Sequence, residues 1–107
     1  MALRRAQAGE KVHLGPLGPA LAGAKTHALV KTDRFEVVRL VLQAGASLPA
    51  HAVAGYISLQ CLEGAMILDA GENIRLRLGD WVYLDRNEQH SLRANEDSSL
   101  LLTIYFD

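Results

Sequence analysis

Apolar and polar residues alternate along two stretches of this chain. In RFEVVRLVL, residues 34–42, and in NIRLRLG, residues 73–79, apolar side chains recur at every second position over much of the run. In the second stretch Ile74, Leu76 and Leu78 alternate with polar neighbours. Because successive side chains of a strand point to opposite faces, this period predicts strands with one face in a core and the other in water.

Turn-forming residues interrupt these runs at short intervals, and no stretch shows a clear helical period. Short strands joined by turns about every 8 to 12 residues are typical of a β-sandwich or a β-barrel. The sequence therefore predicts an all-β fold. The expected turns are Thr32-Asp33, Gly45-Ala46-Ser47, Glu63-Gly64, Ala70-Gly71-Glu72, Gly79-Asp80, Arg86-Asn87 and Glu96-Asp97.

The segment before the first predicted strand has a different composition. GEKVHLGPLGPALAG, residues 9–23, is rich in glycine and proline, which permits a short extended piece but no long helix. We therefore expect residues 1–24 to form an irregular N-terminal arm and residues 25–107 to form the barrel domain.

The last stretch, SSLLLTIYF, is apolar at nearly every position from Leu100 to Phe106. A strand of this kind is expected to be covered on both faces. Either the N-terminal arm or a second subunit can provide the outer cover, and the pattern does not choose between them.

Composition narrows the classes of function. The chain has 107 residues, which suits one compact domain, and a formal net charge of -1 with charges of both signs interspersed. The sequence shows no basic cluster for nucleic acid and no apolar run long enough to span a membrane, so we expect neither a nucleic-acid partner nor a membrane partner. It also shows no secretory signal, so we expect a cytoplasmic protein. Cys61 is the single cysteine, which excludes an intrachain disulfide and a thiolate-only metal site.

Gly45 and His51, followed further along the chain by Gly79-Asp80 and His90, have the spacing of two motifs of a known family. From Val30 to the C-terminus the chain resembles a small single-domain cupin of the cupin 2 type. That family has a first motif with two histidines and a carboxylate between glycines, and a second with a proline, a glycine, a histidine and an asparagine. The resemblance implies a double-stranded β-helix, which is a jelly-roll-like barrel, and commonly a homodimer. The matching positions are Gly45, His51 and Leu62-Glu63-Gly64 for the first motif, and Gly79-Asp80, Trp81-Val82-Tyr83-Leu84 and His90 for the second.

The chain departs from both motifs. Val53 stands where the first motif has its second histidine, and Tyr56, Ile57 or Ser58 stands where it has its carboxylate. In the second motif the proline and glycine are replaced within residues 85–89, where Asn87 retains turn chemistry. Asn95 lies beyond the position of the family's asparagine. The expected metal site is therefore degenerate.

His51 and His90 are the expected pair at the barrel mouth. Two imidazoles alone bind a divalent metal weakly, because non-haem iron needs two histidines and a carboxylate and catalytic zinc needs three protein ligands. Zinc, iron, manganese, nickel or copper would therefore need a third donor. Tyr56 and Gln60 are poor candidates, Glu88 is a hypothetical one, and the resemblance places Glu63 toward solvent.

Three classes of function stay open at this point. The favoured one is a module in which the barrel encloses an apolar small molecule oriented by His51, Tyr56, Gln60 and His90. The second is a metal-dependent cupin enzyme, of oxygenase or isomerase type, with the two histidines as ligands and Tyr56 as the candidate catalytic proton donor. The third is a structural or regulatory dimer with a vestigial pocket.

The remaining candidates have simpler interpretations. Cys61 lies in an apolar strand and is expected to be a buried, unreactive thiol. The five other residues are His13 and His27, expected at the surface or core edge, and Trp81, Tyr83 and Tyr105, expected in the core or an interface, where aromatic residues usually lie.

Overall fold

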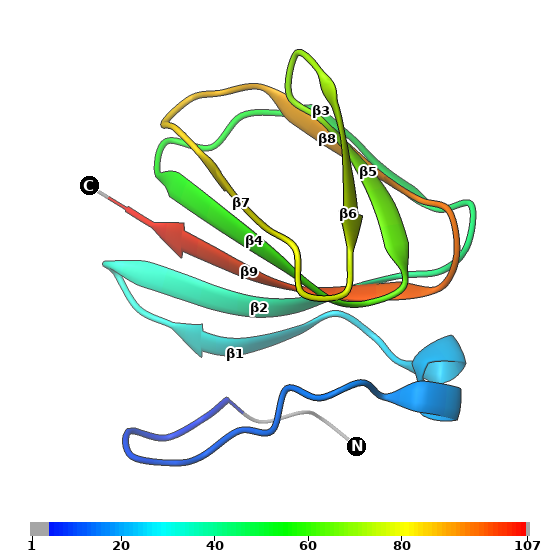
Figure 1. The fold of residues 1–107 in the computed structure, drawn as a ribbon. Helices are drawn as coiled ribbons and strands as arrows, with labels where there is room; N and C mark the ends of the chain where they lie inside the picture. The colour runs from blue at the N-terminus through cyan, green and yellow to red at the C-terminus, as the bar shows by residue number, and fades with distance from the viewer. Residues whose placement is uncertain (1–4, 107) are drawn as a thin grey trace.

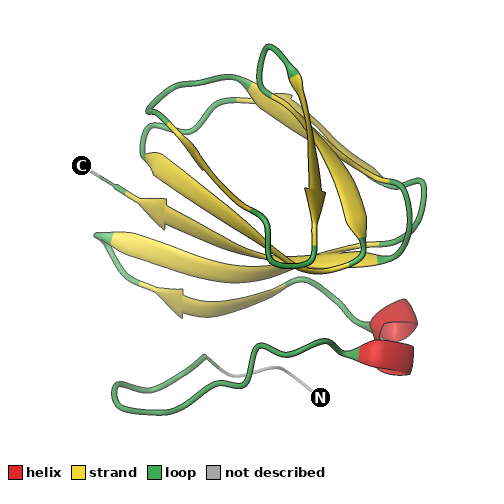
Figure 2. Cartoon of the chain, viewed as in Figure 1, coloured by secondary structure: helices red, strands yellow, loops and turns green. Residues whose placement is uncertain are grey.

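The computed structural model describes residues 5–106, which fold into two antiparallel sheets facing one another (Figures 1 and 2). One sheet has the strand order β1-β2-β9-β4-β7 and the other has the order β3-β8-β5-β6. The elements are the 3-10 helix η1 (Gly18–Gly23) and the strands β1 (His27–Lys31), β2 (Phe35–Leu42), β3 (Ser47–His51), β4 (Tyr56–Glu63), β5 (Ala65–Asp69), β6 (Asn73–Arg77), β7 (Trp81–Leu84), β8 (His90–Ala94) and β9 (Ser98–Tyr105).

The predicted all-β double-stranded β-helix is confirmed, and each predicted turn falls at a junction of two strands, although Ser47 is already the first residue of β3 and Glu63 is still the last residue of β4. Strands far apart in sequence are neighbours within each sheet: β9 lies between β2 and β4, and β8 lies between β3 and β5. Within residues 5–106 there is no helix long and apolar enough to cross a membrane.

The core occupies the space between the two sheets. Along β4, Ile57, Leu59 and Cys61 are each almost fully buried, which is the period of two expected for a strand with one face in a core. Their partners from the opposite sheet include Met66 and Leu68, both 0% exposed. Aliphatic side chains therefore fill the barrel, and no apolar ligand is needed to do so. The buried cluster consists of Leu40, Leu42, Ile57, Leu59, Cys61, Met66, Leu68, Leu76, Leu84, Leu92, Ala94 and Leu100.

The predicted alternation in residues 73–79 is wrong at its last position. β6 ends at Arg77, and Leu78 is 66% exposed in the turn that follows. The reason is local, because Asp80 accepts a hydrogen bond from the Arg77 N–H at 2.9 Å and Gly79 adopts a φ of 90°. This turn geometry removes Leu78 from the strand before it can reach the core face.

The N-terminal arm lies outside the barrel, beside β1 (Figure 1). The Ala6 N–H donates to the carbonyl of Leu29 in β1 at 2.7 Å, and the Gln43 side chain donates to the Leu21 carbonyl in η1 at 3.2 Å. In the described part of the chain, the arm is connected to Ser99 at the start of β9 only through Glu63 and Arg39. Which of the two expected covers lies over the C-terminal strand stays open, and Tyr105 at its end is 53% exposed.

Glu63 was expected to point to solvent, and this expectation is wrong. Its carboxylate accepts hydrogen bonds from the arm N–H groups of Leu17 at 2.8 Å and Gly18 at 3.3 Å, and from the Ser99 hydroxyl at 3.0 Å. It also pairs with Arg39 of β2 at 3.3 Å, and the two side chains are only 13% and 10% exposed. The turn at Gly64 directs Glu63 under the arm, so this carboxylate joins three separate parts of the chain.

The ionisation of Glu63 reflects this setting. Burial opposes its negative charge, but the hydrogen bonds from Leu17, Ser99 and Gly18, together with the Arg39 guanidinium, outweigh burial and lower the pKa of the Glu63 carboxyl below its ordinary value. Glu63 is therefore ionised at neutral pH and holds the arm as a carboxylate.

Candidate functional site

The first candidate site lies at one end of the barrel, where β3 ends and β8 begins. His51 and His90 are register partners in the β3–β8 pair, so their side chains leave the backbone on the same side. Their ring centroids are 4.4 Å apart, with a tilt of 54° between the ring planes. His90 is 6% exposed, whereas His51 is exposed. The structure therefore brings together the two histidines that the sequence singled out.

Both imidazoles are oriented by the backbone. The His51 Nδ1 lies 3.0 Å from the Pro49 carbonyl, and the His90 Nδ1 lies 3.0 Å from the Glu88 carbonyl. A carbonyl oxygen can only accept, so each Nδ1 carries a proton, and in the neutral tautomer of each ring the Nε2 is an acceptor. The pair thus offers two acceptor nitrogens on rings whose orientation is held.

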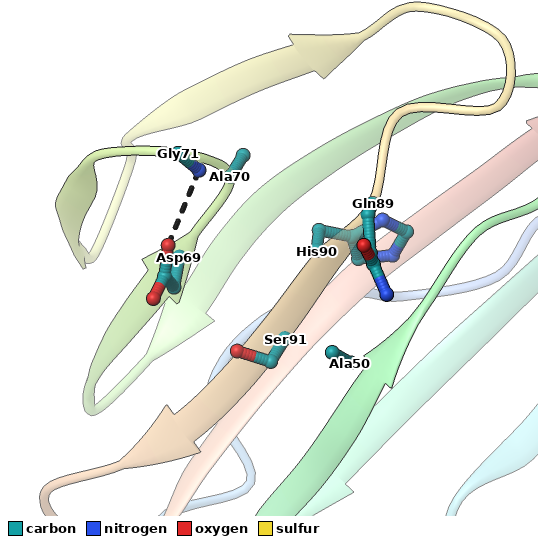
Figure 3. Close-up of a pocket in the computed structure, with 7 residues that line it drawn as sticks. All are labelled: Ala50, Asp69, Ala70, Gly71, Gln89, His90 and Ser91. Carbon is teal, nitrogen blue, oxygen red and sulfur yellow. Dashed lines mark hydrogen bonds between the residues drawn. The ribbon is translucent and has the colours of Figure 1, made fainter.

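A cavity of about 380 Å³ opens beside His90 at this rim (Figure 3). His90, Gln89 and Ser91 come from the β8 side, and Asp69 comes from the end of β5, where its Oδ1 accepts a hydrogen bond from the Gly71 N–H at 3.2 Å. Its walls combine small and polar side chains, so this rim suits a hydrophilic molecule. The lining residues are Ala50, Asp69, Ala70, Gly71, Gln89, His90 and Ser91.

Tyr56 and Gln60 do not share this site. Both lie on β4 at positions that alternate with the buried Ile57 and Leu59, so they face outward from the five-stranded sheet. The Tyr56 ring stacks on Tyr83 at a centroid distance of 6.2 Å, and Gln60 is exposed. Their predicted place in a common pocket with the histidines is wrong.

Among the described residues, packed side chains of the core cluster lie between the two sheets, where the sequence predicted an enclosed apolar pocket. Val53, which stands at the position of the family's second histidine, packs against the core cluster. The cavity next to His90 lies at the rim of the barrel rather than at its centre.

The donors present do not fit a complete metal site. Within the described residues 5–106, no group of three or more His, Cys, Asp and Glu side chains is placed to hold a metal ion. Glu88 does not complete the set, since its carboxylate accepts from the Asp85 N–H at 3.4 Å while its carbonyl holds His90. Two imidazoles fall short of the donor sets of non-haem iron and catalytic zinc.

The loop before His90 keeps the geometry that the sequence suggested. Asn87 adopts a φ of 61°, a left-handed conformation that asparagine tolerates better than most residues. Its N–H donates to the Val53 carbonyl at 2.9 Å, which joins the loop before β8 to the loop after β3. This bond helps to hold the two histidine-bearing segments at the same rim.

The other candidates are placed as follows. Cys61 is 1% exposed, and burial raises the pKa of its thiol, as expected for an unreactive cysteine. Tyr56, Trp81, Tyr83 and Tyr105 line a shallow cavity on the outer face of the five-stranded sheet. Trp81, Tyr83 and Tyr105 are 62%, 51% and 53% exposed, so of the two expected positions, core or interface, the core is excluded for all three and the interface stays a prediction. His13 and His27 line a cavity under the arm.

Two functional features were missed by the sequence reasoning. Asp69 and Gln89 at the rim belong to no recognisable sequence motif. Asp69 comes near His90 only because β5 pairs with β8, where Asp69 is the register partner of Ser91. Arg39 interrupts the apolar run VVRLVL, and a lone charge in such a run is the available signal for a buried ion pair.

Comparison with known proteins supports the fold. A cupin superfamily protein from Desulfitobacterium hafniense superposes with a TM-score of 0.76 at 16% identity, over 92% of this chain and 100% of that one. KdgF from Halomonas sp. gives a TM-score of 0.66 at 20% identity, over 77% of this chain and 78% of that one. Salicylate 1,2-dioxygenase from Pseudaminobacter salicylatoxidans gives 0.64 at 23% identity, over 67% of this chain and only 21% of the dioxygenase.

The chain therefore has the fold of a small cupin domain, as the motif resemblance indicated. Similarity at these identities defines the fold and leaves the activity open. No protein-family model matches the sequence, and no curated protein matches it significantly.

Proposed function

We propose that this chain binds a small hydrophilic molecule at the rim of the barrel, with hydrogen-bond donors of the ligand directed at the Nε2 atoms of His51 and His90. The observation that carries the proposal is the orientation of the two rings. Each Nδ1 is 3.0 Å from a backbone carbonyl, and the ring centroids are 4.4 Å apart. Two neighbouring imidazole acceptors suit a molecule with neighbouring hydroxyl or amino groups.

The surroundings support the same chemistry. The cavity of about 380 Å³ lies within the ~300–1,000 Å³ range of small-molecule sites. Gln89, Ser91 and Asp69 add donors and acceptors at its wall, while Ala50 and Gly71 leave room for the ligand. Ser91 and Asp69 alternate with the buried Leu92 and Leu68, so they face the outer side of the four-stranded sheet, and of the two histidines only His90 lines the cavity. A ligand that contacts both histidines and this wall would therefore have to cross the edge of the barrel at His90.

A thermal-shift screen of small polyols, amino alcohols and sugar acids tests the proposal. Compounds that raise the melting temperature of the wild-type chain should be tested next against His51→Ala and His90→Ala. We expect both substitutions to abolish the shift, and expect Gln60→Ala on the outer face to leave it unchanged. If no compound binds, or if binding survives loss of both histidines, the proposal is wrong.

A metal-dependent enzyme is the second candidate, because the ring orientation favours it. Metal-ligating histidines commonly donate their second ring N–H to a carbonyl or carboxylate, as His51 and His90 do. The short donor set counts against this candidate. Metal content measured by plasma mass spectrometry on tag-free protein distinguishes the two candidates. About one equivalent of metal per chain in the wild type, lost in the His51→Ala, His90→Ala double variant, would make the metal-dependent enzyme the preferred function.

The homodimer and the cytoplasmic location remain predictions. The exposed outer surface formed by Tyr56, Trp81, Tyr83 and Tyr105 supports a dimer, since aromatic side chains are enriched in interfaces. Sedimentation should then show twice the 11.6 kDa chain mass, and Trp81→Ser should shift the species toward the monomer. An 11.6 kDa species alone at micromolar concentration would refute the dimer.

A further inference from the structure

A second cavity, of about 600 Å³, lies between the N-terminal arm and the outer face of β1 and β2. The arm forms one wall and the sheet residues His27, Leu29 and Arg39 form the other. It is on the far side of the sheet from the packed core, so it is separate from the rim site. The lining residues are Val12, His13, Leu14, Leu17, Ala20, Gly23, Ala24, Lys25, His27, Leu29 and Arg39.

The side chains of this cavity divide into two kinds. Most are aliphatic, among them Val12, Leu14, Leu17 and Leu29. Among the described residues that line the cavity, each titratable one is basic: His13, Lys25, His27 and Arg39. An apolar space with basic groups at its wall is complementary to a molecule with an apolar body and one anionic end.

Arg39 provides the specific feature. The residue is 8% exposed, and its Nη2 already donates to the Gly15 carbonyl at 2.9 Å, to Glu63 at 3.3 Å and to the Ser99 hydroxyl at 3.2 Å. Its Nε–H is fully buried and finds no hydrogen-bond partner among residues 5–106. A buried donor without an acceptor is costly, and buried donors in folded proteins are nearly always paired. The guanidinium beside the cavity therefore has one donor without an acceptor, and because that donor is closed off in this structure, a ligand can reach it only after the groups that cover it shift.

We propose that the cavity under the arm binds a monocarboxylate with an aliphatic or aromatic body. One carboxylate oxygen accepts from the Arg39 Nε–H and the other faces Lys25, while the body packs against Leu17 and Leu29. Glu63 neutralises part of the Arg39 charge, so the site requires the unpaired N–H and the Lys25 ammonium in addition to the guanidinium charge. The ligand would bridge the arm and the sheet.

Octanoate is the first probe, titrated by isothermal calorimetry into the full chain at neutral pH. We expect saturable binding of one equivalent. The alcohol 1-octanol has the same apolar body without the charge, and acetate has the charge without the body, so both should bind much more weakly. Equal binding of 1-octanol and octanoate, or no saturable binding of octanoate at millimolar concentration, would overturn the proposal.

Variants locate the site without disturbing the Arg39 pair. Ala20→Trp places a large side chain at the cavity wall and should abolish octanoate binding, whereas Ala22→Trp, in the same 3-10 helix but outside the lining, should not. Lys25→Gln should weaken binding roughly twofold to fivefold, the range for loss of one exposed ion pair. Lys11→Gln, also on the arm, is its control.

The same titration separates this site from the rim. Octanoate should bind the His51→Ala, His90→Ala double variant as it binds the wild-type chain. Loss of binding in that variant, or unchanged binding in Ala20→Trp, would show that the carboxylate binds elsewhere and that the assignment to the arm cavity is wrong.

Discussion

The carboxylate of Glu63 should be one of the most stabilising groups outside the core, and Glu63→Ala tests this. The substitution removes four interactions at once: two with arm N–H groups, one with the Ser99 hydroxyl and one with Arg39. It also leaves Arg39, whose side chain is 10% exposed, without its counter-ion. The loss is therefore that of a buried ion pair broken on one side.

Breaking a buried pair in this way costs about 3–5 kcal/mol. A domain of this size has a total stability of roughly 5–15 kcal/mol, so the expected loss is a large fraction of it. At about 4 °C per kcal/mol, the melting temperature should fall by roughly 12–20 °C. Glu63→Gln keeps the size and one acceptor oxygen, so its cost should be smaller, about 1–3 kcal/mol.

Urea unfolding followed by Trp81 fluorescence measures the free energy of unfolding, provided that the transition is two-state. Glu72→Ala, at an exposed turn, is the control and should change stability by less than about 0.5 kcal/mol. Trypsin cleavage after the exposed Lys11 reports separately on the arm and should be faster in Glu63→Ala. A loss below about 1 kcal/mol with unchanged cleavage would refute the reasoning that Glu63 holds the arm.

The effect of Glu63→Ala should depend on pH in a defined direction. The pKa of Glu63 is lower in the folded chain than its ordinary value of 4.5, so its contribution is fully present above that value and is lost as pH falls through the folded pKa. The wild-type chain should therefore approach the stability of Glu63→Ala as pH falls below 4.5 and through the lowered pKa of Glu63 in the folded chain. A gap that stays constant while the Glu63 carboxylate becomes protonated would show that the carboxylate charge is not its source.

Further predictions concern the core and one turn. Gly64 has a φ of 89°, and a Cβ there would overlap the Ser98 hydroxyl and lie 2.5 Å from the Asp97 carbonyl, so Gly64→Ala should cost at least about 1–3 kcal/mol in urea unfolding. Gly71→Ala, with a φ of 94° but open space around it, should cost less, and equal costs would contradict the role of crowding. Burial raises the pKa of the Cys61 thiol, so a thiol reagent should label it only in denaturant, and rapid labelling of the native chain would contradict its burial.

The strands and turns of this chain could be predicted from sequence because each depends on local chemistry. The period of two in residues 34–42 and 73–77 and the glycine and asparagine turns all carry a local physical signal. Leu78 shows where that signal fails, because a turn that begins one residue early exposes a leucine that continues the pattern.

The site could be predicted only in part. His51 and His90 follow from motif spacing, but the faces of Tyr56 and Gln60 depend on strand parity. Both lie at positions that alternate with the apolar Ile57. Had this period of two been followed along the motif, it would have placed both side chains on the outer face of the barrel. No local pattern joins Arg39 to Glu63, since their contact requires the arm to fold over sheet positions far away in sequence.

The position of the arm also bears on how the chain avoids self-association. β1 ends the five-stranded sheet on one side, and the outer edge of such a strand presents unpaired backbone groups that can recruit a strand from another molecule. The Ala6 N–H is bonded to the Leu29 carbonyl of β1, so the arm occupies part of this edge. If protonation or substitution of Glu63 detaches the arm, we expect the free edge of β1 to become available for pairing with another molecule. The carboxylate that stabilises the folded chain would then also protect it against aggregation.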